Sequence, residues 1–285
     1  MRSLLKADFF SLLKSKITYV VLFICIGAPL LVVALYVGLG MATSSMTEGE
    51  VSLFSIVNGR DLMFSTFSLS SNAGLIIPIF AGILVMADIR NGTARNKVII
   101  GKSRNKIYFS QLIVSITFCV AMCLVSFLIT AGGSLIFFKY GYPFDGKEVW
   151  NFAKAFIVGV LTFAYVATLA TFIALSTKSM PLTIVFTLLV VVGLSLLCQL
   201  SFLVPDGNKL IYVFYLMPTY GTSMISSSVL ALLGGEGELL SDKIFFFCLG
   251  SLLGFSALNT GLGILLFNKA ELKWNFRSKY KCRLN

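Results

Sequence analysis

The 285-residue sequence contains no histidine and few charged residues. Only 12% of its residues are Asp, Glu, Lys or Arg, whereas a soluble domain carries about 25%, so a water-soluble fold is excluded. The missing histidine excludes the usual zinc proteases of membranes and the proteases that pair Ser with His. A Ser–Lys pair would need a lysine buried in the membrane, and we expect Lys154 and Lys243 at the outer boundary. We therefore predict no catalytic residue and no metal site.

Charge is also missing from seven long stretches, which dominate the chain. They cover residues 17–47, 62–87, 107–138, 155–177, 179–205, 210–235 and 244–268. Each could cross a bilayer, which needs roughly 20 apolar residues. Backbone groups in hydrocarbon must be hydrogen-bonded within the protein, and residues such as 182–197 do not alternate as barrel strands do, so the stretches predict helices. Their lack of carboxylates argues against an aspartyl protease and against proton coupling.

The distribution of basic residues predicts that six of the seven stretches span the membrane, since Lys and Arg accumulate on the cytoplasmic side. If residues 210–235 do not cross, 17 of the 23 Lys and Arg residues are cytoplasmic. If they cross, the basic tail after Asn268 lies outside. The same stretch contains Pro218 and the serine triplet 226–228, which favour a broken hairpin that dips into the outer leaflet.

These patterns predict an all-α membrane protein with six transmembrane helices, an N-terminal interfacial helix and an extracellular re-entrant helical hairpin before the last span. We expect one transmembrane domain over 1–285, multi-pass in a bacterial inner (plasma) membrane, with both termini cytoplasmic. Its expected parts are an interfacial helix at 1–16, spans at about 17–41, 66–87, 107–133, 152–176, 181–204 and 244–268, a cytoplasmic loop at 88–106, an extracellular hairpin at 205–243 and a cytoplasmic tail at 269–285.

The first 16 residues predict an amphipathic helix. Leu5, Phe9, Leu12 and Leu13 are spaced as on one side of a helix. Such a helix lies in the membrane interface, with lysine side chains toward the lipid phosphates. A plain cytoplasmic extension of the first span stays open as an alternative, because Phe10 and Asp8 spoil a clean apolar face.

The loop between the second and third expected spans is the most informative stretch. Asn91 and Thr93 are good N-cap residues, residues 94–100 can form two helical turns, and Gly101 suits the left-handed position that ends a helix. Ser103 can then cap the third span. The short helix would present Val98, Ile99 and Ile100 for docking, flanked by Arg90, Arg95, Lys97, Lys102, Arg104 and Lys106. Such a loop either holds lipid head groups or docks a cytoplasmic partner.

This loop resembles that of the permease subunits of type-2 ABC exporters. Their loop carries an acidic residue, Gly-Thr four and five positions later, and a Pro or Gly before Ser-Arg at the start of the third span. The matching residues here are Asp88, Gly92, Thr93, Gly101, Ser103 and Arg104. Asp88 stands where Glu is commoner, and Gly101 near where Pro is commoner. The N-terminal helix, the six spans and the broken hairpin are similar as well, so the resemblance covers nearly the whole chain.

The resemblance implies that residues 88–106 form a coupling loop for a separate cytoplasmic ABC ATPase. Two copies of that ATPase would bind ATP and magnesium, while this chain would bind no cofactor. The chain would pair with a second permease subunit, identical or related, in membrane lipid, and no nucleic-acid partner is expected. The implied coupling residues are Asp88, Arg90, Asn91, Gly92, Thr93, Arg95, Lys97, Val98, Ile99, Ile100, Gly101, Ser103 and Arg104.

One motif in this loop is misleading. Gly101, Lys102 and Ser103 read like the end of a phosphate-binding P-loop. The full motif needs another glycine five positions before Gly101, where Asn96 stands, and a strand before the loop. We therefore expect no nucleotide binding by this chain.

The expected function is ATP-driven export of an amphipathic or hydrophobic cargo, such as a peptide, a drug or a lipid-like molecule. The path through the spans is free of charge and rich in Phe, Ser and Thr, which favours such a cargo over a bare ion. An ATP-independent secondary transporter or channel and a structural or sensory membrane subunit stay open as alternatives. The hairpin residues Pro218, Ser226, Ser227 and Ser228 are candidates for an extracellular gate.

A stripe of small residues follows one side of the last span, formed by Gly250, Gly254, Ala257 and Gly261. Small residues let membrane helices approach closely. The stripe predicts either a dimer seam or helix packing inside one subunit.

Overall fold

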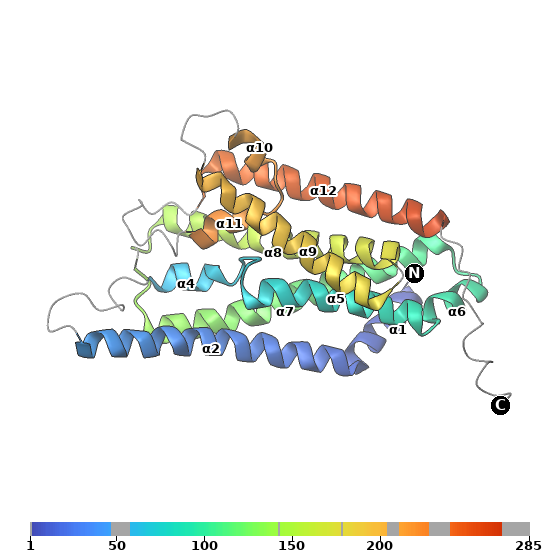
Figure 1. Cartoon of the computed structure of the whole chain (residues 1–285), viewed down its shortest axis with the longest axis horizontal. Helices are drawn as coiled ribbons and strands as arrows, with labels where there is room; N and C mark the ends of the chain where they lie inside the picture. The colour runs from blue at the N-terminus through green and yellow to red at the C-terminus, as the bar shows by residue number, and fades with distance from the viewer. Residues whose placement is uncertain are drawn as a thin grey trace.

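The computed structural model of the chain describes residues 2–46, 58–141, 143–177, 179–203, 211–227 and 240–269. In chain order its helices are α1 (Arg2–Lys14), α2 (Lys16–Met46), α4 (Gly59–Ser65), α5 (Asn72–Arg90), α6 (Thr93–Ile99), α7 (Arg104–Phe137), α8 (Gly146–Thr177), α9 (Met180–Gln199), the 3-10 helix η1 (Leu200–Leu203), α10 (Ile211–Tyr215), α11 (Tyr220–Ser227) and α12 (Asp242–Lys269) (Figure 1). No strand occurs in these ranges. The predicted all-α membrane fold is confirmed.

Five helices are each long and apolar enough to cross a membrane, namely α2, α7, α8, α9 and α12. A sixth candidate is α5 together with α6, a pair bent by 51°. With 19 residues α5 alone rises about 28 Å, close to the thickness of the hydrocarbon core. We therefore take α5 as the second span and α6 as a separate helix beyond it. The five residues of α10 and the eight of α11 are too few to cross.

The short helices gather at the two ends of the bundle (Figure 1). At one end lie α1, α6 and the C-terminal end of α12, and at the other lie α4, α10 and α11. The first and the last helix therefore share an end, as an even number of spans requires. The predicted tail after Lys269 lies outside the described residues.

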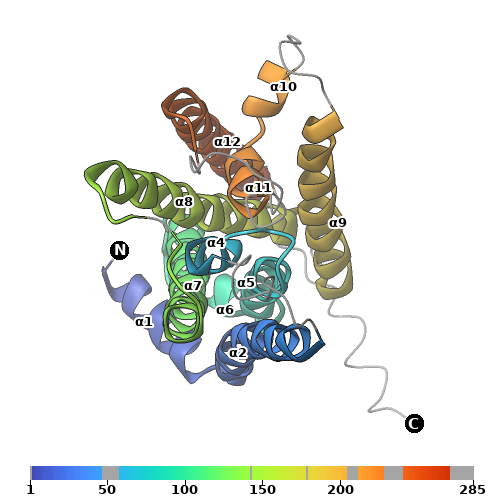
Figure 2. The ribbon, with the colours of Figure 1, turned by 90° about the vertical axis from the view of Figure 1, so that its left-hand side faces the viewer.

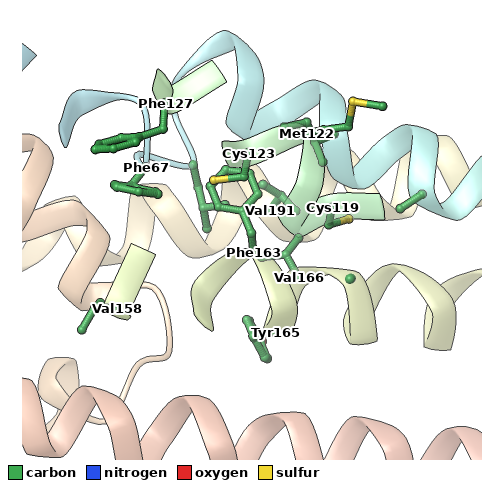
Figure 3. Close-up of a cluster of buried hydrophobic side chains, with 14 of the residues drawn as sticks. Phe67, Cys119, Met122, Cys123, Phe127, Val158, Phe163, Tyr165, Val166 and Val191 are labelled. Carbon is green, nitrogen blue, oxygen red and sulfur yellow. The ribbon is translucent and has the colours of Figure 1, made fainter. Parts of the chain in front are cut away.

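The central helix of the bundle is α8, which packs against α5, α7, α9 and α12 (Figure 2). A larger share of α8 is buried than of any other candidate span in the described chain. The core around it contains Phe163 and Val166 of α8, Phe127 of α7 and Phe67 of the turn after α4 (Figure 3). The rings of Phe67 and Phe127 stack with 4.9 Å between their centroids. Aromatic packing therefore fills the space between α4, α7 and α8.

The outer helices of the bundle expose apolar side chains along their length. Such surface is unfavourable in water and is covered by lipid or by another membrane helix. Exposed residues on α2, α9 and α12 include Leu31, Leu35, Val185, Leu189, Leu253 and Leu258. The burial pattern thus agrees with a bundle that stands in a bilayer.

The second span begins at Asn72, later than the expected start at residue 66. In the preceding turn the Ser71 hydroxyl donates to the backbone oxygen of Ser68 at 2.6 Å and accepts from the backbone nitrogen of Gly74 at 3.1 Å. Serine side chains that bond to nearby backbone favour caps over helix interiors. The separate short helix α4 before this turn was not predicted from the sequence.

The N-terminal helix α1 is separated from α2 by a break at Ser15, so it is no simple extension of the first span. Its buried side differs from the predicted apolar face. Leu4 and Asp8 are buried, whereas Phe10 and Leu13 are exposed. Asp8, which interrupted the apolar pattern, therefore faces the bundle, and the exposed apolar residues are free to enter the membrane interface.

Candidate functional site

The loop between α5 and α7 folds into α6 at the end of the bundle that also carries α1 (Figure 1). The chain bends by 51° between α5 and α6. Gly92, at the N-cap of α6, has a φ of 74°, and Gly101, just after its end, has a φ of 85°. Residues with a side chain rarely adopt such angles, so these glycines set both ends of the helix. The left-handed conformation predicted for Gly101 is confirmed.

The capping predicted for this helix is wrong in detail. Gly92 occupies the N-cap, and Asn91 is instead the C-cap of α5. The Thr93 hydroxyl donates to the backbone oxygen of Asp88 at 2.6 Å, which ties the first turn of α6 to the last turn of α5. Thr93 therefore stabilises the bend rather than capping the helix. Ser103 occupies the N-cap of α7, without a side-chain hydrogen bond.

Lys97 of α6 points into the bundle, toward two carboxylates. Its Nζ lies 2.5 Å from Oδ1 of Asp8 on α1 and 3.7 Å from Oδ2 of Asp88 on α5. Ser110 of α7 donates its hydroxyl to Oδ2 of Asp8 at 2.6 Å. These contacts join α1, α5, α6 and α7 at one point. Lys97 was predicted to flank a docking surface, but it is an internal anchor of α6.

The charges at this anchor do not balance, because two carboxylates face one ammonium group. Burial raises the pKa of Asp88, Lys97 opposes the rise, and the negative charge of Asp8 adds to it. At 3.7 Å from Lys97, Asp88 is beyond hydrogen-bond distance of the ammonium. The side chains of Thr93 and Gln111 also approach the Asp88 carboxylate, which keeps acceptor capacity at the end of α5 next to α6.

The apolar residues of α6 divide between the inside and the outside of the bundle. Val98 packs against a buried cluster that includes Met86 and Ile107. Ile99 and Ile100 are 70% and 75% exposed. Of the three apolar residues predicted for docking, two face outward, and Val98 instead holds α6 against α5 and α7.

The basic residues of the coupling loop divide in the same way. Lys97 is paired inside, and Nη1 of Arg104 donates to the backbone oxygen of Asn268 at 2.9 Å, which joins α7 to the end of α12. The exposed basic residues are Arg90, Arg95, Lys102 and Lys106. The outward surface of the loop thus combines two isoleucines with positive charge.

Residues 4–194 match the family model described as ABC-2 family transporter protein. The chain belongs to this family. The match covers most of the ABC-2 chain, from α1 into α9. It includes all of α6 and the residues Asp8 and Asp88 that face Lys97. A comparison with curated proteins finds no match. The resemblance predicted from the coupling loop is therefore confirmed by a comparison that does not depend on that loop alone.

Family membership makes the chain the membrane-spanning permease subunit of an ABC transporter. Such a permease is not itself catalytic, and the family implies a partner ABC ATPase and usually a dimer. The expected class of protein is thus shown, while the contact residues for the ATPase stay a prediction.

The opposite end of the ABC-2 permease holds a buried ion cluster that the sequence analysis did not identify. Arg60 of α4 is 1% exposed, and its Nη1 donates to both carboxylate oxygens of Glu148 on α8, at 3.0 and 3.2 Å. Its Nε donates to Asp61 at 3.2 Å, and the Tyr140 hydroxyl donates to Glu148 at 3.2 Å. Burial raises the pKa of Asp61, although Arg60 opposes the rise. The cluster fastens α4 to α8.

A second buried cation links α8 to α12 at the same end. Nζ of Lys154 donates to Oδ1 of Asp242 at 2.9 Å and to the backbone oxygen of Leu240 at 2.7 Å. Lys154 was expected at the outer boundary, and the structure shows that it joins α8 to α12 at the end of the bundle that carries α4. Its ammonium is therefore held by acceptors, which agrees with a structural role.

Pro218 lies in the turn between α10 and α11, at the end of the bundle that carries α4 (Figure 1). α11 packs tightly there, because a methyl group added at Gly221 would lie 2.7 Å from a side chain of α8. The predicted gate residues Ser226 and Ser227 end α11. Ser228 lies outside the described residues, as do residues 205–210 and 229–239 of the predicted hairpin.

The glycine stripe of α12 faces away from the described bundle. Apart from the adjacent residues and the nearby backbone of α12 itself, no atom of the described residues lies within 4 Å of a Cβ added at Gly250, Gly254 or Gly261. α12 instead packs on α8 through its other side, where Leu252 and Cys248 are buried. Close packing inside one subunit, one of the two predicted roles of these glycines, is therefore wrong for the described chain.

Proposed function

We propose that this permease belongs to an ATP-driven exporter and that α6 is the surface on which the separate ATPase docks. The observation that carries the proposal is the pair Ile99 and Ile100, which are 70% and 75% exposed at the end of the bundle shared by α1 and the end of α12. Exposed β-branched side chains beyond the end of a span favour a protein partner that covers them.

The inner side of α6 supports a role in transmitting force. Gly92 and Gly101 set its ends, Thr93 ties it to α5, and Lys97 ties it to α1. A helix held at several points moves its neighbours when a partner pushes on it, whereas a free loop absorbs the motion. The anchoring contacts thus connect the exposed isoleucines to the spans.

A loop that only holds lipid head groups is less well supported. Such a loop would direct its cations outward, but Lys97 is paired with Asp8 and Arg104 with the end of α12. The remaining exposed cations still suit a membrane surface or an acidic rim on the ATPase.

The remaining parts of the proposal concern cargo, assembly and orientation. The spans carry apolar and hydroxyl side chains without a described ion pair at mid-membrane, which favours an amphipathic or hydrophobic cargo.

We propose two ATPase copies that bind ATP and magnesium, a second permease subunit, and an inner-membrane location with α6 in the cytoplasm. Labelling of Lys102→Cys from outside intact cells, with Asp145→Cys unlabelled, would contradict this orientation.

We further propose that the α10–α11 hairpin shapes the outer exit of the path. Pro218 and Thr219 are buried in the turn between its helices. Replacing Pro218 by Leu favours a continuous helix and should reduce transport while ATPase binding persists. Full transport by Pro218→Leu would count against a gate.

The docking proposal is tested with Ile99→Asp combined with Ile100→Asp. Neither side chain is needed for packing, so the variant should insert normally but lose co-purification with the ATPase, because a charge replaces each apolar contact. Phe144→Asp is the matched control: Phe144 is 77% exposed in the loop before α8, near the other end of the bundle, and its replacement should leave the association intact. An undiminished association in the double Asp variant would refute docking on α6.

A further inference from the structure

A cavity of about 500 Å³ lies between α1, α5 and α7, near the end of the bundle that carries α6. Leu84 and Val114 contribute apolar surface to its wall. Asp88, Gln111 and Ser115 contribute polar atoms. A volume of this size, with apolar walls and a few polar groups, is typical of a site for a small molecule or a head group.

Two buried polar side chains in the cavity lack hydrogen-bond partners among the described residues. Gln111 is 4% exposed. Its amide lies beside the Asp88 carboxylate and opposes the rise in the pKa of Asp88, but neither its Oε1 nor its Nε2 has a partner at hydrogen-bond distance. The Oγ of Ser115, one turn further along α7, is also buried and unpaired. Buried polar groups are rarely left unpaired in native proteins, because their desolvation is then uncompensated. These unpaired atoms therefore indicate a ligand that supplies their hydrogen-bond partners.

The charge of the cavity indicates the sign of that ligand. Both oxygens of Asp8 are engaged, one by Lys97 and the other by Ser110. Asp88 is held less tightly by Lys97, since its Oδ2 lies 3.7 Å from the ammonium, although the Thr93 and Gln111 side chains also approach its carboxylate. A ligand in the cavity thus meets a carboxylate and further oxygen acceptors. Such surroundings favour a cation with N–H donors over an anion.

We propose that this cavity binds the primary ammonium head group of an amphipathic molecule. The N–H donors of an ammonium match the Asp88 carboxylate, the Gln111 amide oxygen and the Ser115 hydroxyl. The adjoining hydrocarbon lies along the apolar wall and Phe10 of α1, which lines the cavity and is exposed. Lys14, also in the lining, suits a phosphate next to the ammonium. Phosphatidylethanolamine of the bilayer and a soluble alkylamine both carry this chemistry.

Paired probes that differ only in N-methylation test the proposal on the full chain without the ATPase. In nanodiscs with equal amounts of phosphatidylethanolamine and phosphatidylcholine, the lipids retained by the protein are counted by native mass spectrometry. We expect phosphatidylethanolamine to be retained at least about tenfold better, because methylation keeps the charge but removes the donors. In detergent, binding of dodecylamine is compared with that of dodecyltrimethylammonium. Stronger binding of the unmethylated member of either pair supports the site. The pair that shows it identifies the ligand as a bilayer lipid or a soluble amine, whereas equal binding within both pairs overturns the proposal.

Gln111→Leu tests whether the preference arises in this cavity. The variant removes both unpaired amide atoms, so the melting temperature without ligand should hold or rise while the preference falls by about tenfold or more. Thr187→Val is the matched control, because the hydroxyl of Thr187 on α9 is also buried and unpaired but does not line the cavity. Full preference in Gln111→Leu overturns the proposal. If that variant does not fold, Ser115→Ala replaces it with the same two outcomes.

Discussion

Lys97 on α6 and Asp8 on α1, 89 residues apart in the chain, form an ion pair with 2.5 Å between Nζ and Oδ1. The pair ties α6 to α1, while Ile99 and Ile100 at the end of α6 stay exposed. Because breaking it would leave a buried carboxylate without its counter-charge, α6 and α1 are expected to move together. The N-terminal helix is therefore part of the device that receives the ATPase in our proposal.

Breaking this pair should destabilise the permease. Asp8→Asn leaves Lys97 without its closest partner and should lower the free energy of unfolding by up to about 3 kcal/mol. Thermal unfolding of the purified chain in detergent measures the loss. Exchange of the two charges, Asp8→Lys with Lys97→Asp, should restore part of it. Lys102→Met, which changes an exposed lysine of the same loop, should be neutral, and equal stability of Asp8→Asn and wild type would contradict the anchoring role.

The left-handed conformation of Gly101 predicts a graded response to substitution. Gly101→Val places a β-branched side chain at a φ of 85° and should cost about 1–3 kcal/mol locally, so the end of α6 and the ATPase contact should be lost while insertion persists. Gly101→Asn is the matched control, because Asn tolerates this region. Co-purification with the ATPase distinguishes the two variants. An active Gly101→Val protein would be inconsistent with a rigid α6.

The ion cluster at the other end predicts that Glu148 matters more than Asp61. Glu148→Gln removes the negative charge and one of the two oxygens that accept from buried Arg60, and should cost about 3–5 kcal/mol. Asp61→Asn should cost less, because burial raises the pKa of Asp61 and its ionised form is already disfavoured. Melting temperatures of the two variants test this order, and the reverse order would mean that Arg60 relies on Asp61.

Gly221 of α11 and Gly250 of α12 have different surroundings, which predict opposite outcomes for replacement by Ala. Gly221→Ala places a methyl group 2.7 Å from Val158 and 3.1 Å from Cys248, which should displace α11 and cost about 1–3 kcal/mol. Gly250→Ala meets no atom within 4 Å and should not destabilise the single chain. Unfolding in detergent compares them. If Gly250→Ala lowers dimer yield without changing the melting temperature of the monomer, the glycine stripe contacts a second copy.

Local features of this protein followed from its sequence. Long charge-free stretches must become helices in hydrocarbon because no other backbone arrangement pairs its hydrogen bonds there, except a closed barrel. The left-handed turn at Gly101 followed from the conformational freedom of glycine beside a helix-forming segment. The loop pattern from Asp88 to Arg104 also indicated the family that the comparison confirms. Each of these depends on residues close together in the chain.

The direction in which each side chain faces was decided by tertiary structure. Asp8 seemed to spoil an apolar face, yet it meets Lys97 inside the bundle, and Arg60 meets Glu148 across 88 residues of sequence. Val98 turns inward while Ile99 turns outward, although the two residues are equally apolar. Composition and spacing determine that a helix forms and crosses the membrane. Which of its sides becomes core, anchor or exposed surface depends on the helices that pack beside it, because an ion pair or a core contact exists only once both partners are brought together.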